Sequence, residues 1–172
     1  MKPTLLDDGG RKIEYDCDVW IGKVIFAEPS LDDIDDDGNN DLMMGESRLS
    51  KLEREMIAVV VSSVNRCYYC LTAHGQAVRE MSGDPALGEL LIMNYRAATL
   101  TTRQRAILDF AHKLTATPAE VSDVERRALK RAGCNDREIW DIASVAAFFN
   151  LSNRMATAVD MMPNLEYHAK SR

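Results

Sequence analysis

The sequence has few cysteines and no excess of basic residues, and each absence excludes a class of protein. Its 172 residues include four cysteines, too few for the disulfide framework of a small secreted protein. The 21 Lys and Arg are outnumbered by 27 Asp and Glu, which gives a net charge of −6. Phosphate binding requires clustered Lys and Arg, so we expect no nucleic-acid partner.

The sequence also lacks the long apolar run of a membrane span, about 18 uninterrupted residues. The longest apolar tract, residues 139–159, contains Asp141, Asn150, Asn153 and Arg154, and it predicts a buried helix instead. The opening MKPTLLDDGG turns acidic within eight residues, unlike a secretory signal. We therefore expect a cytoplasmic protein with no membrane partner.

From about residue 50 onward the sequence is typical of an all-α domain. The 46% of apolar residues can form one sizeable core. Ser50 and Glu53 are spaced as a capping box and predict a helix over 50–64. Further helices are predicted at 67–81, 86–95, 102–115, 122–132, where Ser122 and Glu125 form a second box, and 136–160. We assign residues 42–172 to this helical domain.

Residues 1–41 form a different, divergent N-terminal segment. Residues 18–27 are compatible with a short strand or a helix edge, and LDDIDDDGNNDL predicts an acidic loop. The start and ninth position of an EF-hand calcium loop are matched by Asp33, Asp35, Asp37, Gly38 and Asp41. Met44 stands where that loop needs a bidentate glutamate, so a solvated acidic loop is favoured over a calcium site.

The stretch CYYCLTAH carries the main candidate for chemistry. Cys67, Cys70 and His74 are separated by three and then four residues, which places them on one face of a helix. The start of that helix favours a thiolate, and His74 is one turn from Cys70, within reach for proton transfer. A thiolate can attack a peroxide, become a sulfenic acid and form a disulfide with a neighbouring thiol.

Two structural interpretations compete with this chemistry. His74 could satisfy a core hydrogen bond while the cysteines pack, or the three side chains could hold a structural zinc ion, with a glutamate as fourth ligand. Zinc knuckles usually place CxxC in a turn and take their other ligands from a separate element. Glu55 lies at the edge of a buried helix face, where most glutamates are only surface groups. Cys17 and Cys134 stand alone and are expected to be small apolar residues.

The frame EREMIAVVVSSVNRCYYCLTAH, with Glu55, Cys67, Cys70 and His74, resembles the active-site motif of the alkylhydroperoxidase D family, which is grouped with carboxymuconolactone decarboxylase-like proteins. The later AAFFNLSNRMATAVD is similar to the last core helix of the peroxidase-related branch. The resemblance covers roughly residues 42–160. It implies an all-α, cofactor-free and metal-free thiol peroxidase that assembles as a homotrimer or homohexamer.

By matched positions, the resemblance implies that Cys70 attacks the peroxide and Cys67 resolves the product. His74 and Glu55 would form the proton relay. The expected substrate is a small hydroperoxide. The expected reductant is a lipoyl-bearing adaptor, a thioredoxin-like protein or a small thiol.

The sequence departs from the family pattern at Tyr69, where the best-studied type has a histidine. A phenol titrates far above an imidazole, which weakens any proton role at this position. Residues 1–41 also lack the helical lead-in of peroxidase-related members. Three alternatives stay open: a carboxymuconolactone-type decarboxylase, a protein thiol–disulfide oxidoreductase, and a redox sensor.

Overall fold

The computed structural model describes residues 4–6, 12–14, 42–43 and 45–172. Two three-residue strands, β1 (Thr4–Leu6) and β2 (Lys12–Glu14), pair antiparallel with Leu5 opposite Ile13; the sequence did not predict them. The interpretations placed on residues 18–27, on the calcium-like loop and on Cys17 lie outside the described residues. The division of the chain at residue 41 stays a prediction.

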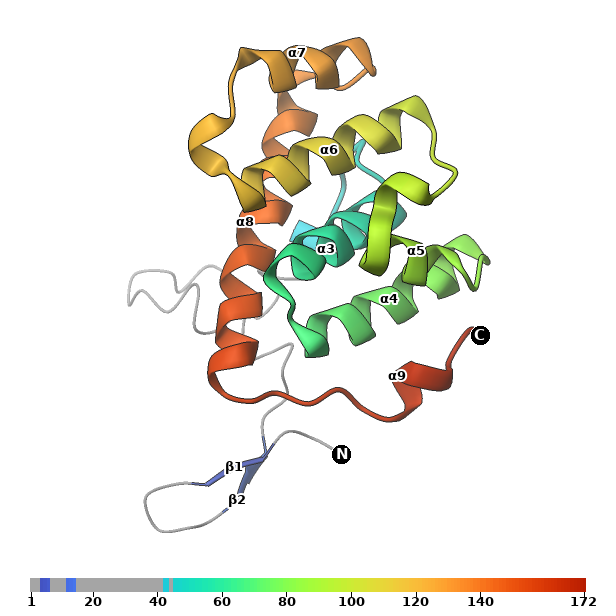
Figure 1. Cartoon of the computed structure of the whole chain (residues 1–172), viewed down its shortest axis with the longest axis vertical. Coiled ribbons are helices and arrows are strands. Elements are labelled where there is room, and N and C mark those ends of the chain that lie inside the picture. The colour runs from blue at the N-terminus through green and yellow to red at the C-terminus, as the bar shows by residue number, and fades with distance from the viewer. Residues whose placement is uncertain (1–3, 7–11, 15–41, 44) are drawn as a thin grey trace.

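The described part from residue 45 onward is helical (Figure 1). The helices are α3 (Lys51–Asn65), α4 (Tyr68–Ser82), α5 (Leu87–Asn94), η1 (Tyr95–Ala97), α6 (Thr102–Ala116), η2 (Pro118–Glu120), α7 (Asp123–Arg131), α8 (Asp136–Ala158) and α9 (Glu166–Ala169). All six predicted helices are confirmed, and the largest boundary difference is at the end of α8, which was predicted at 160 and lies at 158. The two short 3-10 helices and α9 were not predicted.

Side-chain caps fix where the helices begin. The predicted capping boxes of Ser50 with Glu53 and Ser122 with Glu125 are formed. Two further boxes, which the sequence analysis missed, open α6 and α8 through Thr101–Gln104 and Asn135–Glu138. Each satisfies backbone N–H groups that have no partner inside the helix.

Helix α3 is the centre of the fold, and α4, α5, α6 and α8 pack around it. Residues 56–61 are each at most 1% exposed. This explains why the β-branched run Val59–Val61 is helical: it is covered by neighbouring helices on every side, and tertiary packing outweighs its modest preference for strands. Cys134 belongs to the same core, as expected.

Helix α8 is buried on one side only, which corrects the prediction of a buried helix. Ile142, Val145 and Phe149 are in the core, whereas Trp140 is 69% exposed and Leu151 is 40% exposed. Among the described helices, none combines the length and apolar character needed to cross a bilayer.

Close packing of α4 on α5 depends on two glycines. A Cβ at Gly88 would lie 2.7 Å from the main-chain oxygen of Gly75, and one at Gly75 would lie 3.3 Å from Ile92 Cδ1. The short approach holds α4, the helix that carries Cys70 and His74, against the core.

Candidate active site

A sharp turn between α3 and α4 positions the first cysteine. Arg66 ends α3 in the left-handed conformation, with φ 56° and ψ 35°. The Arg66 N–H donates to the Ser62 and Ser63 carbonyls, and the Cys67 N–H donates to Ser62 O at 3.1 Å. This is the Schellman arrangement that closes a helix. Cys67 is therefore the N-cap residue of α4, just outside the helix on which it was predicted.

The two sulfurs of the CxxC motif lie together at the start of α4. Cys67 Sγ and Cys70 Sγ are hydrogen-bonded at 2.9 Å, and both cysteines are free thiols that are 2% exposed. A disulfide requires an S–S distance of about 2.05 Å. A small approach of the two sulfurs is therefore enough to join them.

Negative charge in this pair is favoured on Cys67. The hydrogen bond from the Cys70 thiol lowers the pKa of Cys67 to about 6; burial opposes this shift, while a Thr157 hydrogen bond and the charge of His74 support it. The same bond to Cys67, together with burial, raises the pKa of Cys70, and a hydrogen bond with the Asn153 side chain lowers it. Of the two sulfurs, Cys67 is therefore the one on which a thiolate is favoured.

A half-buried His74 and a buried Glu55 are hydrogen-bonded to each other. His74 Nδ1 donates to Glu55 Oε2 at 2.7 Å, and Glu55 is 6% exposed. The ring of Phe149 meets the His74 ring edge to face, with centroids 4.6 Å apart. A buried carboxylate is costly without a partner, and this bond orients the His74 ring with Nδ1 towards Glu55.

Polar side chains of α8 line the site beside the sulfurs, which the sequence did not predict. Asn153 is 1% exposed; its Nδ2 donates to Ser62 Oγ at 3.0 Å, and its Oδ1 accepts from Asn65 Nδ2 at 2.9 Å. These bonds orient the amide so that its N–H groups face Ser62 and Cys70. Asn153 and Thr157 each hydrogen-bond one sulfur. The sequence shows that these two residues are four positions apart and so share one face of a helix. It contains no local signal that this face packs against α4.

Apolar residues from the C-terminal part close the site. Ala156 and Met161 are buried in one cluster with both cysteines, and Tyr69 and Val159 pack against it. Beyond Met161 the chain returns along α4, where Arg79 donates to the Tyr167 and Lys170 carbonyls; Figure 1 shows α9 beside α4. Tyr69 thus contributes packing to the site.

The four predicted residues are brought together, since α3 carries Glu55, α4 carries Cys70 and His74, and the turn between them carries Cys67. In the described part of the chain, no group of three or more His, Cys, Asp or Glu side chains is arranged to hold a metal ion. The zinc interpretation therefore has no ligand set there.

Comparison with known proteins identifies the class. The family described as Carboxymuconolactone decarboxylase family matches residues 36–113. A crystal structure of a peroxidase-related protein from Silicibacter sp. TM1040 is 63% identical, covers 78% of this chain and 70% of its own, and superposes with a TM-score of 0.77. A peroxidase-related protein from Ralstonia eutropha JMP134, described as an alkylhydroperoxidase AhpD core, is 42% identical over the same shares, with a TM-score of 0.76.

A more distant likeness concerns the fold alone. The debrominase Bmp8 is 19% identical, covers 72% of this chain and 66% of its own, and has a TM-score of 0.63. None of the curated proteins matches the chain.

These matches define an all-α protein with the alkylhydroperoxidase D-like fold, as predicted. The chain belongs to the alkylhydroperoxidase D-like, carboxymuconolactone decarboxylase-like family.

Proposed function

We propose that the protein is a cysteine-based peroxidase that reduces small hydroperoxides through a reversible Cys67–Cys70 disulfide. The observation that carries this proposal is the 2.9 Å sulfur pair flanked by the hydrogen-bonded His74 and Glu55. Membership of a family with peroxidase-related relatives supports it. No cofactor or metal ion is required.

In the first step, Cys70 attacks the hydroperoxide. Its proton passes to Cys67 or to His74, and the Cys70 thiolate takes the outer peroxide oxygen, which breaks the O–O bond. The products are Cys70 sulfenic acid and an alcohol, whose oxygen receives a proton from the relay. Asn153 stabilises the thiolate form through its hydrogen bond to the sulfur.

In the second step, Cys67 attacks the sulfenic sulfur of Cys70. Besides the hydrogen bond from Cys70, a hydrogen bond from Thr157 and the nearby His74 lower the pKa of Cys67. These two groups still favour its thiolate after the Cys70 thiol has been oxidised. The S–S bond forms as hydroxide leaves and is protonated to water. The sum is one hydroperoxide and two thiols giving one alcohol, one water and one disulfide.

His74 and Glu55 act as the proton relay. Glu55 binds Nδ1 of His74, so Nε2 exchanges protons with the reacting groups. A buried carboxylate strengthens the histidine as a base, which is how such pairs promote proton transfer.

Reduction of the disulfide needs an external thiol. A lipoyl-bearing adaptor, a thioredoxin-like protein or a small thiol would serve.

We also propose a cytoplasmic homotrimer or homohexamer. Large apolar side chains such as Trp140, 69% exposed, and Leu165, 83% exposed, support the assembly, because they are suited to contacts between copies. Light scattering coupled to size-exclusion chromatography measures this assembly directly.

The decisive experiment is intact-protein mass spectrometry with thiol counting after one equivalent of cumene hydroperoxide. We expect the reduced protein to lose two hydrogens, mapped to Cys67–Cys70. The Cys67→Ser variant should instead gain one oxygen on Cys70. If the Cys70→Ser variant gains an oxygen on Cys67 while the Cys67→Ser variant gains none on Cys70, the two roles are reversed.

A second candidate, thiol–disulfide exchange with a protein substrate, is favoured by the low pKa of Cys67, lowered to about 6 by its hydrogen bond with Cys70. The 2% exposure of both cysteines opposes direct access by a protein. Insulin reduction without peroxide consumption would select this activity. A decarboxylase would react with neither substrate.

A further inference from the structure

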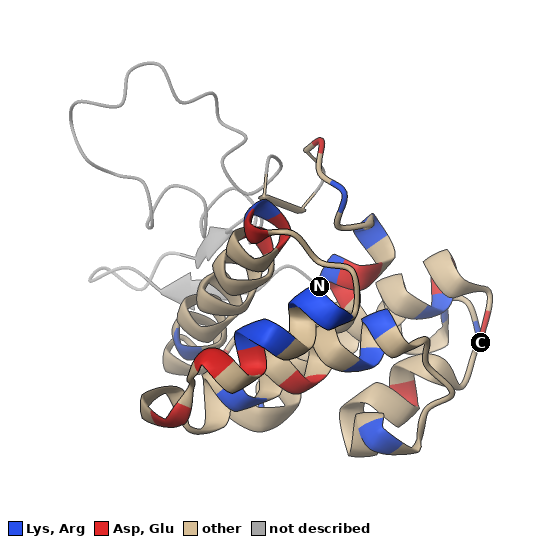
Figure 2. Ribbon diagram, turned by 90° about the horizontal axis from the view of Figure 1, so that it is seen from above, with Lys and Arg blue, Asp and Glu red and all other residues tan. Residues whose placement is uncertain are grey.

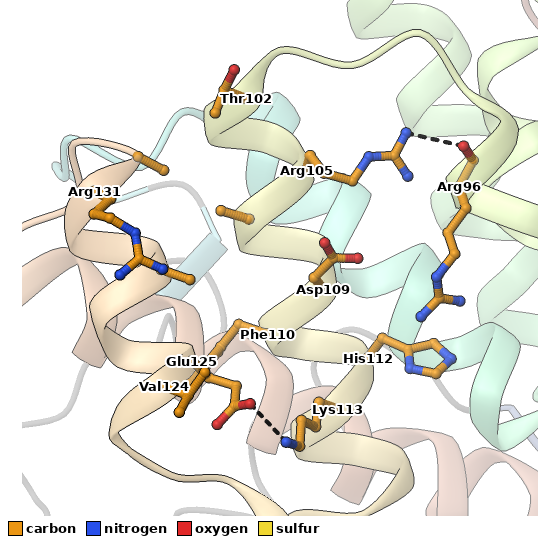
Figure 3. Close-up of a pocket in the computed structure, with 13 residues that line it drawn as sticks. Arg96, Thr102, Arg105, Asp109, Phe110, His112, Lys113, Val124, Glu125 and Arg131 are labelled. Carbon is orange, nitrogen blue, oxygen red and sulfur yellow. Dashed lines mark hydrogen bonds and ion pairs between the residues drawn. The ribbon is translucent and has the colours of Figure 1, made fainter.

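A cavity of about 700 Å³ lies between α6, α7 and η1, separate from the cysteines (Figure 3). This volume is in the range of about 300–1,000 Å³ that holds small organic ligands. None of its lining residues belongs to α3, α4 or α8, so it is a separate candidate site.

Cations are in excess around the cavity. Its wall contains four cationic side chains, Arg96, Arg105, Lys113 and Arg131, and two carboxylates, Asp109 and Glu125. Both carboxylates already have partners: Asp109 accepts from the Tyr95 hydroxyl at 2.8 Å, and Glu125 binds Lys113 at 2.7 Å. Lys113 and Glu125 neutralise each other, whereas the Tyr95 hydroxyl is neutral, so three arginines and the single carboxylate of Asp109 remain and the lining has a net positive charge.

The three arginines make contacts that leave their charge uncompensated. Arg105 donates to the main-chain oxygens of Tyr95, Arg96 and Ala98. Arg96 lies over the Tyr95 ring, 4.6 Å from its centroid. Arg131 has no ion pair within the described part of the chain. Three other cations on α7 and α8 do have ion pairs: Arg126 with Asp123, Lys130 with Asp136, and Arg137 with Asp141.

His112 does not add to this charge at neutral pH. Burial lowers its pKa, and the nearby Arg96 lowers it further, against the opposing effect of Asp109. The ring of His112 is held 5.5 Å from that of Tyr95. In Figure 3, Arg96 and His112 lie together on one side and Arg131 on the other, with Arg105 and Asp109 of α6 between them.

Apart from Thr102, the remainder of the wall is apolar. Phe110 is 5% exposed, and Ala106, Val124, Ala128 and Ala132 also line the cavity. Over the whole chain acidic residues predominate, and charges of both signs are interspersed along the helices in Figure 2. A concave surface with unpaired guanidinium groups beside an apolar wall is therefore a local exception, suited to an anion with an apolar body.

We propose that this cavity binds a small organic carboxylate, with the carboxylate held by Arg131 and the apolar portion against Phe110 and Val124. This site is independent of the peroxidase reaction, and its test does not use enzyme activity. The full-length protein would be titrated by calorimetry with octanoate, with its uncharged isostere octanamide, and with inorganic phosphate.

We expect octanoate to bind at least tenfold more tightly than octanamide, and an Arg96→Gln/Arg131→Gln double variant to lose at least tenfold in octanoate affinity. The matched control is Arg127→Gln, an exposed arginine of the same helix that does not line the cavity; its affinity should be unchanged. Arg131→Gln alone should also weaken binding, and because Arg131 has no ion pair in the described part of the chain, this change leaves the fold intact.

Three results would overturn the proposal. They are absence of octanoate binding, equal affinity for octanamide, and an equal loss in Arg127→Gln. Phosphate binding as tight as octanoate binding, lost in the double variant, would also overturn it, because it would make the apolar wall irrelevant.

Discussion

The cysteine site and the arginine-lined cavity differ in whether their charged groups have partners within the protein. At the cysteine site, buried and half-buried groups are paired with one another: Cys67 with Cys70, and Glu55 with His74. At the cavity, partly exposed arginines keep their charge and have no carboxylate partner. The first arrangement is suited to proton and electron transfer among fixed partners, whereas the second is suited to a partner that arrives from solution. The pairing of the charged groups, more than their number, distinguishes the two candidate sites.

The largest effect is expected from removal of the sulfur that attacks the peroxide. Cys70→Ser should abolish peroxide consumption, because a hydroxyl at this position is not ionised at neutral pH. Loss of cumene hydroperoxide, followed with a ferrous-iron dye assay, measures the rate. Cys134→Ser is the matched control, since Cys134 is equally buried but lies in the core beside Arg103. Wild-type turnover in Cys70→Ser would refute the mechanism.

The next largest effect is expected from the proton relay. His74→Gln and Glu55→Gln should each slow single-turnover disulfide formation by roughly 10²- to 10⁴-fold, the range for a lost proton-transfer group. Because the two residues act as one unit, the double variant should be little slower than either single variant. If the rate losses of the two single variants multiply in the double variant, His74 and Glu55 act separately. Thermal unfolding of each variant separates loss of structure from loss of chemistry.

Asn153 tests whether the polar side chains of α8 act on the sulfur. Asn153→Ala removes the hydrogen bond to Cys70 and should slow disulfide formation by about 10- to 100-fold, in line with about 1.5–3 kcal/mol for a hydrogen bond to a charged group. Asn150→Ala is the matched control: Asn150 lies one turn earlier and also binds Asn65. A similar rate loss in both variants would indicate only a structural role for Asn153.

The ionisation of Cys67 should make the reactivity of the cysteine site depend on pH. Its pKa is lowered to about 6, chiefly by the hydrogen bond from Cys70, so the thiolate predominates above pH 6 and is lost as the pH falls through that value. The alkylation rate of Cys67 by iodoacetamide in the Cys134→Ser background should fall about tenfold per pH unit below 6. In Cys70→Ala this inflection should move upward, because no donor to the Cys67 sulfur remains at position 70. An inflection near 9 in the reduced pair would contradict the assigned charge.

The sequence predicted the fold well because the helices depend on local signals, and three of the four candidate site residues lie close together in the chain. Capping residues and helical periodicity locate each helix, and Cys67, Cys70 and His74 are close in the chain. Glu55 was reached through the family resemblance, since only the packing of α3 on α4 brings it to His74. Asn153 and the arginine-lined cavity were missed because they depend on contacts between distant helices, such as the one that places Asn153 beside Ser62.

The smallest predicted effect concerns the turn that holds the sulfur pair. Arg66 occupies the left-handed region with φ 56°, which costs a non-glycine residue roughly 1–2 kcal/mol. Arg66→Gly removes this strain but gives the unfolded chain more freedom, worth about 0.5–1 kcal/mol. The free energy of unfolding, measured by urea denaturation, should therefore change by no more than about 1 kcal/mol. Arg66→Val should lower it by more, because a β-branched residue is poorly tolerated at positive φ.

If the turn sets the distance between the sulfurs, Arg66→Gly should form the Cys67–Cys70 disulfide at the wild-type rate and Arg66→Val should form it more slowly.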